Sequence, residues 1–236
     1  MKKTLGIIGG MGPLATVDLF QKIISLTSAE TDHDHIHIIV DCNTNIPDRT
    51  QAILHGGENP LREIAGSARR LIQAGAQILM MACNTAHHFY KEVTQDVDIP
   101  ILNMLQETAI AVQKRGITRV GLLATDATIQ MRLYHEPLAE QGIDILLPSS
   151  NGQQQVMDLI YKGIKAGNFS IDIQPFLQEL QRMQQKGAQA FILGCTELPV
   201  AFERFLIPFV TIDPTEILAR TAILAAGYKP VKTAAF

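Results

Sequence analysis

The 236-residue sequence predicts an α/β fold of two similar lobes, each a mostly parallel sheet flanked by helices. Eight short apolar runs alternate with helical patterns, which is typical of βαβ units. Most of these runs are apolar throughout, as strands covered on both faces should be. The second half of the chain also repeats three motifs of the first half in the same order. We therefore expect two lobes related by a pseudo-two-fold axis, with the active site in the cleft between them.

The apolar runs define the strands, and the segments between them define the helices. Strands are predicted at residues 5–8, 36–41, 78–82, 101–103, 120–124, 143–147, 191–194 and 209–212. Helices are predicted near residues 13–28, 60–74, 85–95, 105–115, 126–141, 153–166, 172–186 and 214–227. Pro13 and Pro214 suit the first turn of a helix, and Asp213 is suited to cap the helix that follows it.

The internal repeat is clearest around Cys83 and Cys195, which lie 112 positions apart. Each cysteine falls ten residues after the first glutamine of a Gln-x-Gly-Ala-Gln motif, at the end of an apolar run. Two further pairs repeat: Gly6-Ile7-Ile8 with Gly121-Leu122-Leu123, and Ile99-Pro100 with Ile207-Pro208. We expect an N-terminal lobe of residues 1–103 plus 213–236, whose C-terminal helix returns to it, and a second lobe of residues 104–212.

The two cysteines are the main candidates for chemistry. Ligands of open parallel sheets bind beyond the carboxyl ends of the strands, so facing lobes would bring Cys83 and Cys195 into one cleft. At such a position, nearby backbone N–H groups and the helix dipole are expected to lower the pKa of a thiol. One thiol on each side of a carbon can remove a proton from one face and return a proton to the other. Cys42 has no counterpart, and we interpret it as a structural or supporting residue.

Composition and charge limit the class of protein. The net charge of −3 leaves no basic excess for a nucleic-acid partner. No apolar stretch approaches the roughly 20 residues that span a bilayer, and no secretory signal is recognisable, so we expect no membrane partner. Three cysteines are an odd number without paired spacing, which favours a reducing compartment, the cytoplasm.

The sequence carries no recognisable metal or cofactor motif. Gly9-Gly10-Met11-Gly12 forms neither a G-x-G-x-x-G nor a P-loop, and it suits an anion subsite or a tight turn equally well. His87 and His88 are adjacent and point in different directions from a helix, and no H-E-x-x-H or C-x-x-C occurs. Nothing marks a lysine for pyridoxal phosphate. We therefore expect no metal site and no cofactor.

Two cations are candidates for binding a carboxylate. Arg49 lies in the polar segment 42–50, which we interpret as a loop. An arginine there can hold a carboxylate with two parallel hydrogen bonds, although most loop arginines are solvated. Lys165 lies near the end of a predicted helix, where the helix dipole alone favours a lysine.

Five motifs resemble those of the aspartate/glutamate racemase family, and in particular its aspartate-racemase branch. They are Gly9-Gly10-Met11-Gly12-Pro13, Pro47-Asp48-Arg49-Thr50, Ala82-Cys83-Asn84-Thr85-Ala86-His87, Tyr161-x-x-Ile164-Lys165-x-Gly167 and Gly194-Cys195-Thr196-Glu197-Leu198. The resemblance implies a cofactor-independent isomerase of two α/β lobes, commonly a homodimer, that acts on a small-molecule amino-acid substrate. Related glutamate racemases usually carry histidine after the second cysteine motif, and the Thr196-Glu197 of this chain favours the aspartate-type branch.

The resemblance also implies a role for each residue that matches a motif. Cys83 and Cys195 would be the catalytic acid–base pair. The implied substrate contacts are Asn84, Thr85 and Thr196 for the α-carboxylate or amino group, Arg49 and Lys165 for a side-chain carboxylate, Met11 and Thr125 as lining of the cleft, and Thr50 and Gln51 beside Arg49.

Other functions remain open at this point. A relative could act on another carbon acid, as a broad-specificity amino-acid racemase, a hydantoin racemase or a maleate isomerase, and the last uses cysteine as a nucleophile. A catalytically inactive ligand-binding protein is a different class, but binding alone does not require two thiols. Aspartate and glutamate are not distinguished, since one methylene changes binding by only about 1–3 kcal/mol in an apolar pocket.

Overall fold

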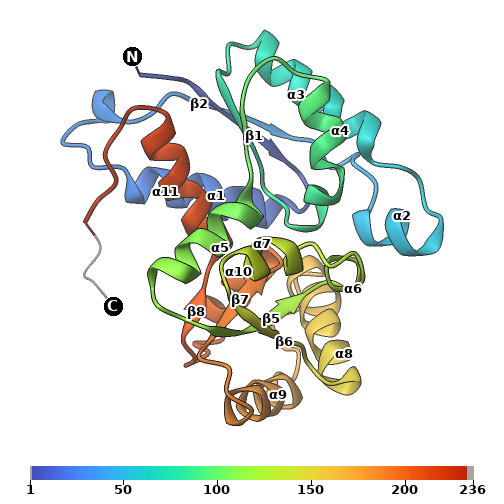
Figure 1. Cartoon of the computed structure of the whole chain (residues 1–236). Coiled ribbons are helices and arrows are strands. Elements are labelled where there is room, and N and C mark those ends of the chain that lie inside the picture. Colours follow the sequence, from blue (N-terminus) through green and yellow to red (C-terminus); the bar gives the residue numbers. More distant parts are fainter. Residues whose placement is uncertain (1, 233–236) are drawn as a thin grey trace.

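The computed structural model describes residues 2–232 and contains two parallel four-stranded sheets flanked by helices (Figure 1). The strand order is β2-β1-β3-β4 in the first sheet and β6-β5-β7-β8 in the second, so both sheets have the same topology. The strands are β1 (Leu5–Gly9), β2 (Ile38–Cys42), β3 (Ile78–Met81), β4 (Ile101–Leu102), β5 (Arg119–Ala124), β6 (Asp144–Leu146), β7 (Ala190–Gly194) and β8 (Thr211–Ile212). The predicted two-lobed α/β class and all eight predicted strands are confirmed.

A glycine in one central strand of each sheet explains one of the repeated sequence motifs. A Cβ added to Gly6 in β1 would lie 2.6 Å from a methyl carbon of Leu79, and one added to Gly121 in β5 would lie 2.6 Å from the ring of Phe191. Both separations are far below van der Waals contact. The large side chain on the neighbouring strand therefore packs directly against the glycine backbone at the same place in each lobe.

All eight predicted helical segments contain helix, several with changed bounds, and two further α-helices were not predicted. The α-helices are α1 (Pro13–Leu26), α2 (Arg49–His55), α3 (Leu61–Gln73), α4 (Tyr90–Gln95), α5 (Met104–Lys114), α6 (Asp126–Gln130), α7 (His135–Glu140), α8 (Ser150–Asp158), α9 (Gln174–Gln185), α10 (Glu197–Arg204) and α11 (Pro214–Ala225). Pro13 and Pro214 are the first helical residues, and the Asp213 side chain accepts a hydrogen bond from the backbone N–H of Thr215, as a capping residue does.

The interpretation of segment 42–50 as a loop throughout is wrong at its end. The helix α2 begins at Arg49, and the Asp48 side chain caps it by accepting from the backbone N–H of Gln51 at 2.9 Å. Gly56 ends this helix in the left-handed conformation after seven residues. A helix of seven residues is too short to produce a recognisable hydrophobic period.

Three other helices differ from their predicted form, and one was not predicted. The segment 85–95 begins as a 3₁₀ helix (Thr85–Phe89) and continues as α4. The segment 126–141 is broken into α6 and α7. The segment predicted at 153–166 begins earlier, as α8, and ends as a π-helical turn (Leu159–Lys165). The break between α6 and α7 contains Arg132, whose φ of 54° lies in the left-handed region. The unpredicted helix α10 has Pro199 in its first turn, where the missing N–H has no cost.

The last helix, α11, lies beside α1 and α5 and joins the cores of both sheets (Figure 1). Its residue Leu218 is buried in the same apolar cluster as Leu5 of β1. Its residue Ile217 is buried in the cluster that contains Val120 of β5. Across residues 2–232, no helix is both long enough and apolar enough to cross a membrane.

Candidate active site

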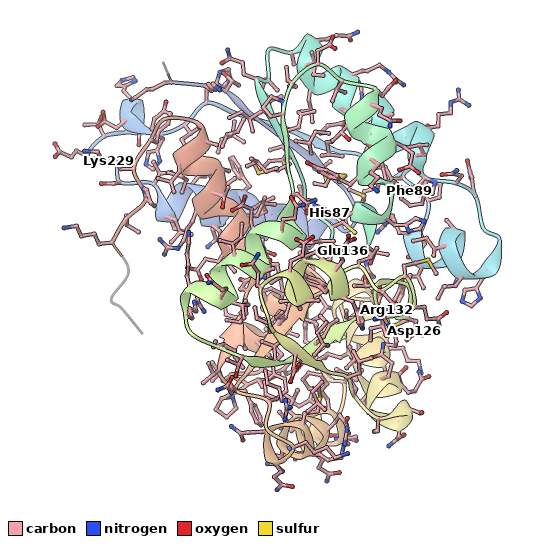
Figure 2. The ribbon with its side chains drawn as sticks, in the orientation of Figure 1. His87, Phe89, Asp126, Arg132, Glu136 and Lys229 are labelled. Carbon is pink, nitrogen blue, oxygen red and sulfur yellow. The ribbon has the colours of Figure 1, made fainter. Side chains whose placement is uncertain are left out.

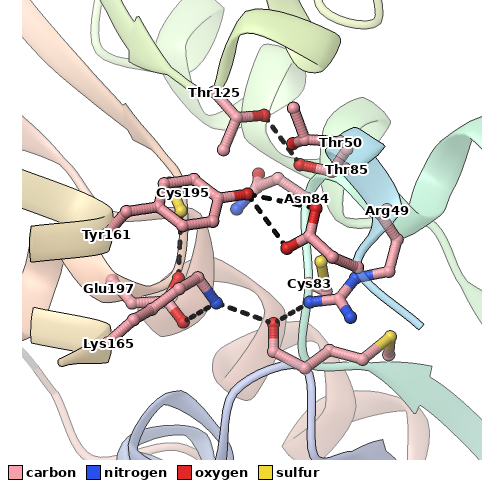
Figure 3. Close-up of a pocket in the computed structure, with 12 residues that line it drawn as sticks. Arg49, Thr50, Cys83, Asn84, Thr85, Thr125, Tyr161, Lys165, Cys195 and Glu197 are labelled. Carbon is pink, nitrogen blue, oxygen red and sulfur yellow. Dashed lines mark hydrogen bonds and ion pairs between the residues drawn. The ribbon is translucent and has the colours of Figure 1, made fainter. Parts of the chain in front are cut away.

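A small closed cavity lies between the two sheets and is lined by both halves of the chain (Figure 3). The lining residues are Met11, Asp48, Arg49, Thr50, Cys83, Asn84, Thr85, Thr125, Tyr161, Lys165, Cys195 and Glu197. The cavity volume is about 10 Å³, which is room for roughly one water molecule. An amino acid can therefore enter only when the side chains or the lobes move apart.

The two predicted thiols share this cavity. Cys83 follows β3 and precedes the 3₁₀ helix Thr85–Phe89, whereas Cys195 follows β7 and precedes α10. Their exposed fractions are only 6% and 5%. In Figure 3 the two side chains lie on opposite sides of the space, one from each lobe. The geometry is thus suited to a ligand held between them.

Glu197 connects Cys195 to Lys165. The Cys195 thiol donates to one carboxylate oxygen of Glu197 at 3.0 Å, and the Lys165 ammonium donates to the other at 2.7 Å. Burial and the Glu197 carboxylate raise the pKa of the Cys195 thiol well above its usual value, against a smaller opposing effect of Lys165. The expectation of a lowered thiol pKa is therefore wrong for Cys195, because burial and a neighbouring anion outweigh the start of α10.

Arg49 lies at the start of α2 rather than in a loop, and it is buried, unlike most loop arginines. One terminal nitrogen donates to the Met11 carbonyl at 2.6 Å, and the other donates to the carbonyls of Pro47 and Ile46. Its Nε is buried and has no hydrogen-bond partner in the part of the chain that the structure describes. Burial opposes the charge, but Cys83 and Asp48 raise the pKa of the guanidinium. The cavity therefore keeps a permanent cation beside Cys83.

Hydrogen bonds between side chains of the two lobes close the cavity. Thr85 of the first half is 2.9 Å from Thr125 of the second, oxygen to oxygen. The Tyr161 hydroxyl donates to both carboxylate oxygens of Asp48, at 3.0 and 3.3 Å. Lys165 also reaches the carbonyl of Met11 at 3.5 Å. These contacts join the two halves of the chain around the cavity.

His87 supports the backbone at Cys83. Its Nδ1 lies 2.9 Å from the Cys83 carbonyl oxygen, and its Nε2 accepts from the backbone N–H of Met104 at 3.1 Å. Figure 2 shows His87 at the side of the first lobe that faces the second. Burial lowers the pKa of this histidine to about 4, so the ring is neutral at pH 7.

A larger hollow adjoins the cavity and shares five of its residues, namely Met11, Asp48, Arg49, Lys165 and Glu197. Its volume is about 370 Å³, and the glycines Gly10 and Gly12 form part of its wall. Gly10 has a φ of 88°, and its N–H donates to the Thr16 hydroxyl. The Gly9–Gly12 segment is therefore a tight turn, and the shared residues separate the hollow from the thiols.

Most of the predicted site residues line the cavity, but two do not. Gln51 is exposed on α2, and Thr196 is buried beside the cavity with its hydroxyl 3.4 Å from the Ala82 carbonyl. Cys42 is exposed and lies outside the site. Asp48 and Tyr161 were not predicted as site residues, although each lies within a motif quoted above, whereas Glu197 follows Cys195 closely enough in the sequence to be expected to orient its sulfur. Their adjacency to selected residues was the available signal.

Within the described part of the chain, no group of three or more histidine, cysteine, aspartate or glutamate side chains is arranged to hold a metal ion. The cavity instead collects two thiols, two cations, two carboxylates and three threonine hydroxyls. These groups can transfer protons and can bind a charged ligand.

The fold and the site define a two-lobed α/β enzyme whose closed cleft carries one thiol from each lobe. The sequence profile described as Asp/Glu/Hydantoin racemase matches residues 8–222. The chain belongs to this family and is an isomerase of the racemase type.

Three similar proteins support this assignment and the aspartate-racemase branch. The aspartate racemase of Picrophilus torridus is 34% identical, with a TM-score of 0.87 over 98% of this chain and 96% of that one. An aspartate racemase homologue from Pyrococcus horikoshii OT3 is 26% identical, with a TM-score of 0.75 over 96% and 99% of the two chains. The broad specificity amino-acid racemase RacX of Bacillus subtilis is 28% identical over 225 residues, which are 93% of this chain and 96% of RacX.

Proposed function

We propose that this protein racemises an acidic amino acid, preferably aspartate, without a cofactor, by two-base proton transfer between Cys83 and Cys195. The observation that carries the proposal is that both thiols line one closed cavity, on opposite sides, together with Arg49 and Lys165. A substrate Cα held between the sulfur atoms would lose its proton to one of them and receive a proton from the other.

The reaction needs one thiolate and one thiol. Cys195 is the thiol in the closed site, because its sulfur donates to the Glu197 carboxylate. We therefore assign Cys83 as the base for the enantiomer whose Cα–H bond points toward it, with Cys195 as the acid. The roles reverse for the other enantiomer. Two thiolates so close together are disfavoured by like-charge repulsion, which helps to keep the mixed state.

The α-hydrogen of an amino acid is very weakly acidic, so the developing enolate-like carboxylate must be stabilised. We propose that Asn84 and Thr85, which both line the cavity, supply hydrogen-bond donors to the α-carboxylate or amino group. The Thr196 hydroxyl faces the Ala82 carbonyl beside the cavity, so we do not assign it a direct substrate contact. Preorganised donors of this kind act as an oxyanion hole, and the loss of one typically costs about 2.7–4 kcal/mol. Closure of the lobes also excludes water, which strengthens each of these interactions.

The assignment of an acidic substrate rests on the two cations of the cavity. Arg49 is buried and Lys165 is half-buried, and the carboxylates of Asp48 and Glu197 lie in the same wall, with Lys165 paired to Glu197. We assign the two cations to the side-chain carboxylate of the substrate, with Met11, Thr50 and Thr125 completing the wall. The likeness to the aspartate racemase of Picrophilus torridus supports aspartate as the first substrate to test.

The second candidate is a broad-specificity amino-acid racemase, which the likeness to RacX favours. The two functions differ in how strongly the protein selects a second carboxylate. Incubation with L-aspartate, L-glutamate and neutral L-amino acids in deuterated water, without added cofactor, tests both. Exchange of the α-hydrogen with loss of optical rotation for aspartate alone supports the first proposal, and equal rates for neutral amino acids support the second. Binding without exchange would reject both.

We also propose that the protein is a homodimer. The exposed side of α1 carries the large apolar residues Leu14, Val17 and Ile24 at helical spacing, a pattern that marks protein–protein contact surfaces. The family resemblance supports a second copy as the partner. Light scattering after size exclusion should give twice the mass of one chain, and a monomer at micromolar concentration would contradict this proposal.

Two smaller proposals concern domain division and compartment. We divide the described chain into one lobe of residues 2–103 with 213–232 and a second lobe of 104–212, while residues 1 and 233–236 of the expected first lobe lie outside the described residues. The burial of Leu218 beside Leu5 supports the return of α11 to the first lobe. We place the protein in the cytoplasm, because Cys42, Cys83 and Cys195 are all free thiols.

A further inference from the structure

A buried tyrosine of the second half of the chain contacts a cavity residue of the first. Tyr134 is fully buried, and its hydroxyl donates to the side-chain oxygen of Asn84 at 2.5 Å. Tyr134 follows the break between α6 and α7, where Arg132 has a left-handed backbone conformation. Backbone strain of this kind persists only where the surrounding structure enforces it. The turn thus directs a phenol across the boundary between the lobes.

The contact leaves the other end of the Asn84 amide free. The exposed fraction of Asn84 is 1%, and its Nδ2 is buried without a hydrogen-bond partner among residues 2–232. Asn84 lines the cavity between the two thiols. Buried polar groups are almost always paired, so an orphan amide nitrogen in a cavity wall indicates a ligand that accepts from it.

The Tyr134 hydroxyl determines which end of the Asn84 side-chain amide is left for a ligand. An asparagine amide is nearly symmetrical in shape, but its oxygen only accepts hydrogen bonds and its nitrogen only donates them. Burial raises the pKa of Tyr134, so its hydroxyl keeps its proton and acts as a donor toward the oxygen. With the oxygen engaged in this way, the nitrogen remains available to a carboxylate.

We propose that Tyr134 is a positioning residue that holds the Asn84 amide so that its nitrogen donates to the substrate α-carboxylate as that group becomes an enolate. The proposal rests on the racemase function proposed above. Because the bond spans the two lobes, it forms only when they close. The cavity must open to admit a substrate, so closure itself orients the donor for the chemical step.

A double-mutant cycle tests whether Tyr134 acts through Asn84. The variants are Tyr134→Phe, which keeps the ring, Asn84→Ala, and the two combined. The matched control is Tyr90→Phe, which removes another phenol whose hydroxyl donates to a backbone carbonyl, that of Ile101, outside the cavity. Each is assayed for kcat, for KM and for the primary isotope effect with α-deuterated L-aspartate.

The expected result is a fall in kcat of about 10- to 100-fold for Tyr134→Phe, with a smaller change in KM and a larger isotope effect. The double variant should lose no more activity than Asn84→Ala alone, and Tyr90→Phe should retain wild-type kcat. If the loss of kcat in the double variant equals the product of the two single losses, the residues act independently and the proposal is overturned. Wild-type kcat in Tyr134→Phe would overturn it as well. A Tyr134→Phe chain that fails to fold where Tyr90→Phe folds would assign Tyr134 a structural role and overturn it too. If the wild-type protein shows no racemisation, the proposed function itself fails instead.

Discussion

The Cys195 thiol and the Glu197 carboxylate form a buried hydrogen bond of 3.0 Å, and Lys165 neutralises the same carboxylate from its other oxygen. Because of this contact, the two thiols of the cavity have different electrostatic surroundings. Cys195 faces an anion, whereas Cys83 faces the guanidinium of Arg49. The Glu197 carboxylate therefore favours the protonated form of Cys195.

Replacing Glu197 by glutamine should lower the pKa of Cys195. Removal of a neighbouring negative charge makes the thiolate less unfavourable, so alkylation of Cys195 should accelerate severalfold at neutral pH. The measurement is the pH dependence of iodoacetamide labelling at Cys195, in a Cys42→Ser and Cys83→Ser background. A labelling profile identical to that of the Glu197 parent would show that this carboxylate does not control the thiol.

Replacing Lys165 by glutamine should mainly weaken the binding of dicarboxylic substrates. The loss of a hydrogen bond from a charged group costs about 1.5–3 kcal/mol, which is roughly a 10- to 150-fold rise in Kd. Calorimetric titration of L-aspartate into a Cys83→Ala background measures this Kd without turnover, and Lys165→Arg serves as the charge-preserving control.

The corresponding change at Arg49 should affect the fold as well as binding. Its guanidinium donates to the carbonyls of Met11, Pro47 and Ile46, so Arg49→Ala should also lower the free energy of unfolding, by about 1–3 kcal/mol. Urea unfolding measures this loss separately from affinity. Unchanged affinity for aspartate in both the Arg49 and the Lys165 variants would remove the assignment of these cations to the side-chain carboxylate.

Removing the Tyr161 hydroxyl should loosen the closed cavity. The hydroxyl donates to Asp48 across the two halves of the chain, and a hydrogen bond of this kind contributes about 0.5–1.5 kcal/mol. Tyr161→Phe should therefore speed the modification of Cys83 and Cys195 by a thiol reagent by about 2- to 10-fold in a Cys42→Ser background. Equal rates in Tyr161→Phe and its parent would indicate that access is controlled elsewhere.

The buried His87 should make stability fall in mild acid. Its pKa is about 4 in the folded protein and 6.5 in the unfolded reference. Between these values the unfolded chain binds a proton that the folded chain excludes, so the free energy of unfolding decreases as pH falls from about 6.5 to about 4. The loss attributable to this group is about 3 kcal/mol. Urea unfolding at pH 7 and pH 5 measures the slope, which a His87→Gln variant should reduce; an equal slope in both proteins would contradict the assignment.

The strands and the facing cysteines could be predicted from sequence because they depend on local pattern. Continuous apolar runs identify buried parallel strands, and the carboxyl end of a strand places Cys83 or Cys195 at the cleft. The repeated glycine motif of Gly6 and Gly121 reflects identical packing in the two lobes.

Contacts made across space could not be predicted in the same way. The burial of Arg49 depends on its hydrogen bond to the Met11 carbonyl, 38 positions earlier in the sequence. The raised pKa of Cys195 depends on its burial and on Glu197, which begins a helix that has no clear sequence signal. Likewise, the Tyr134 hydroxyl and the Asn84 side chain are 50 positions apart in the sequence and meet only in the folded chain. Periodicity and spacing carry no information about such pairs.

The most direct test is racemisation of L-aspartate by the wild-type protein and by the Cys83→Ser and Cys195→Ser variants, followed by chiral chromatography without added cofactor. Loss of an acid–base group typically reduces the rate by about 10²- to 10⁴-fold. We predict such a loss of D-aspartate formation in each single variant, with folding and substrate binding retained. Wild-type turnover by either variant would contradict two-base catalysis by this pair of thiols.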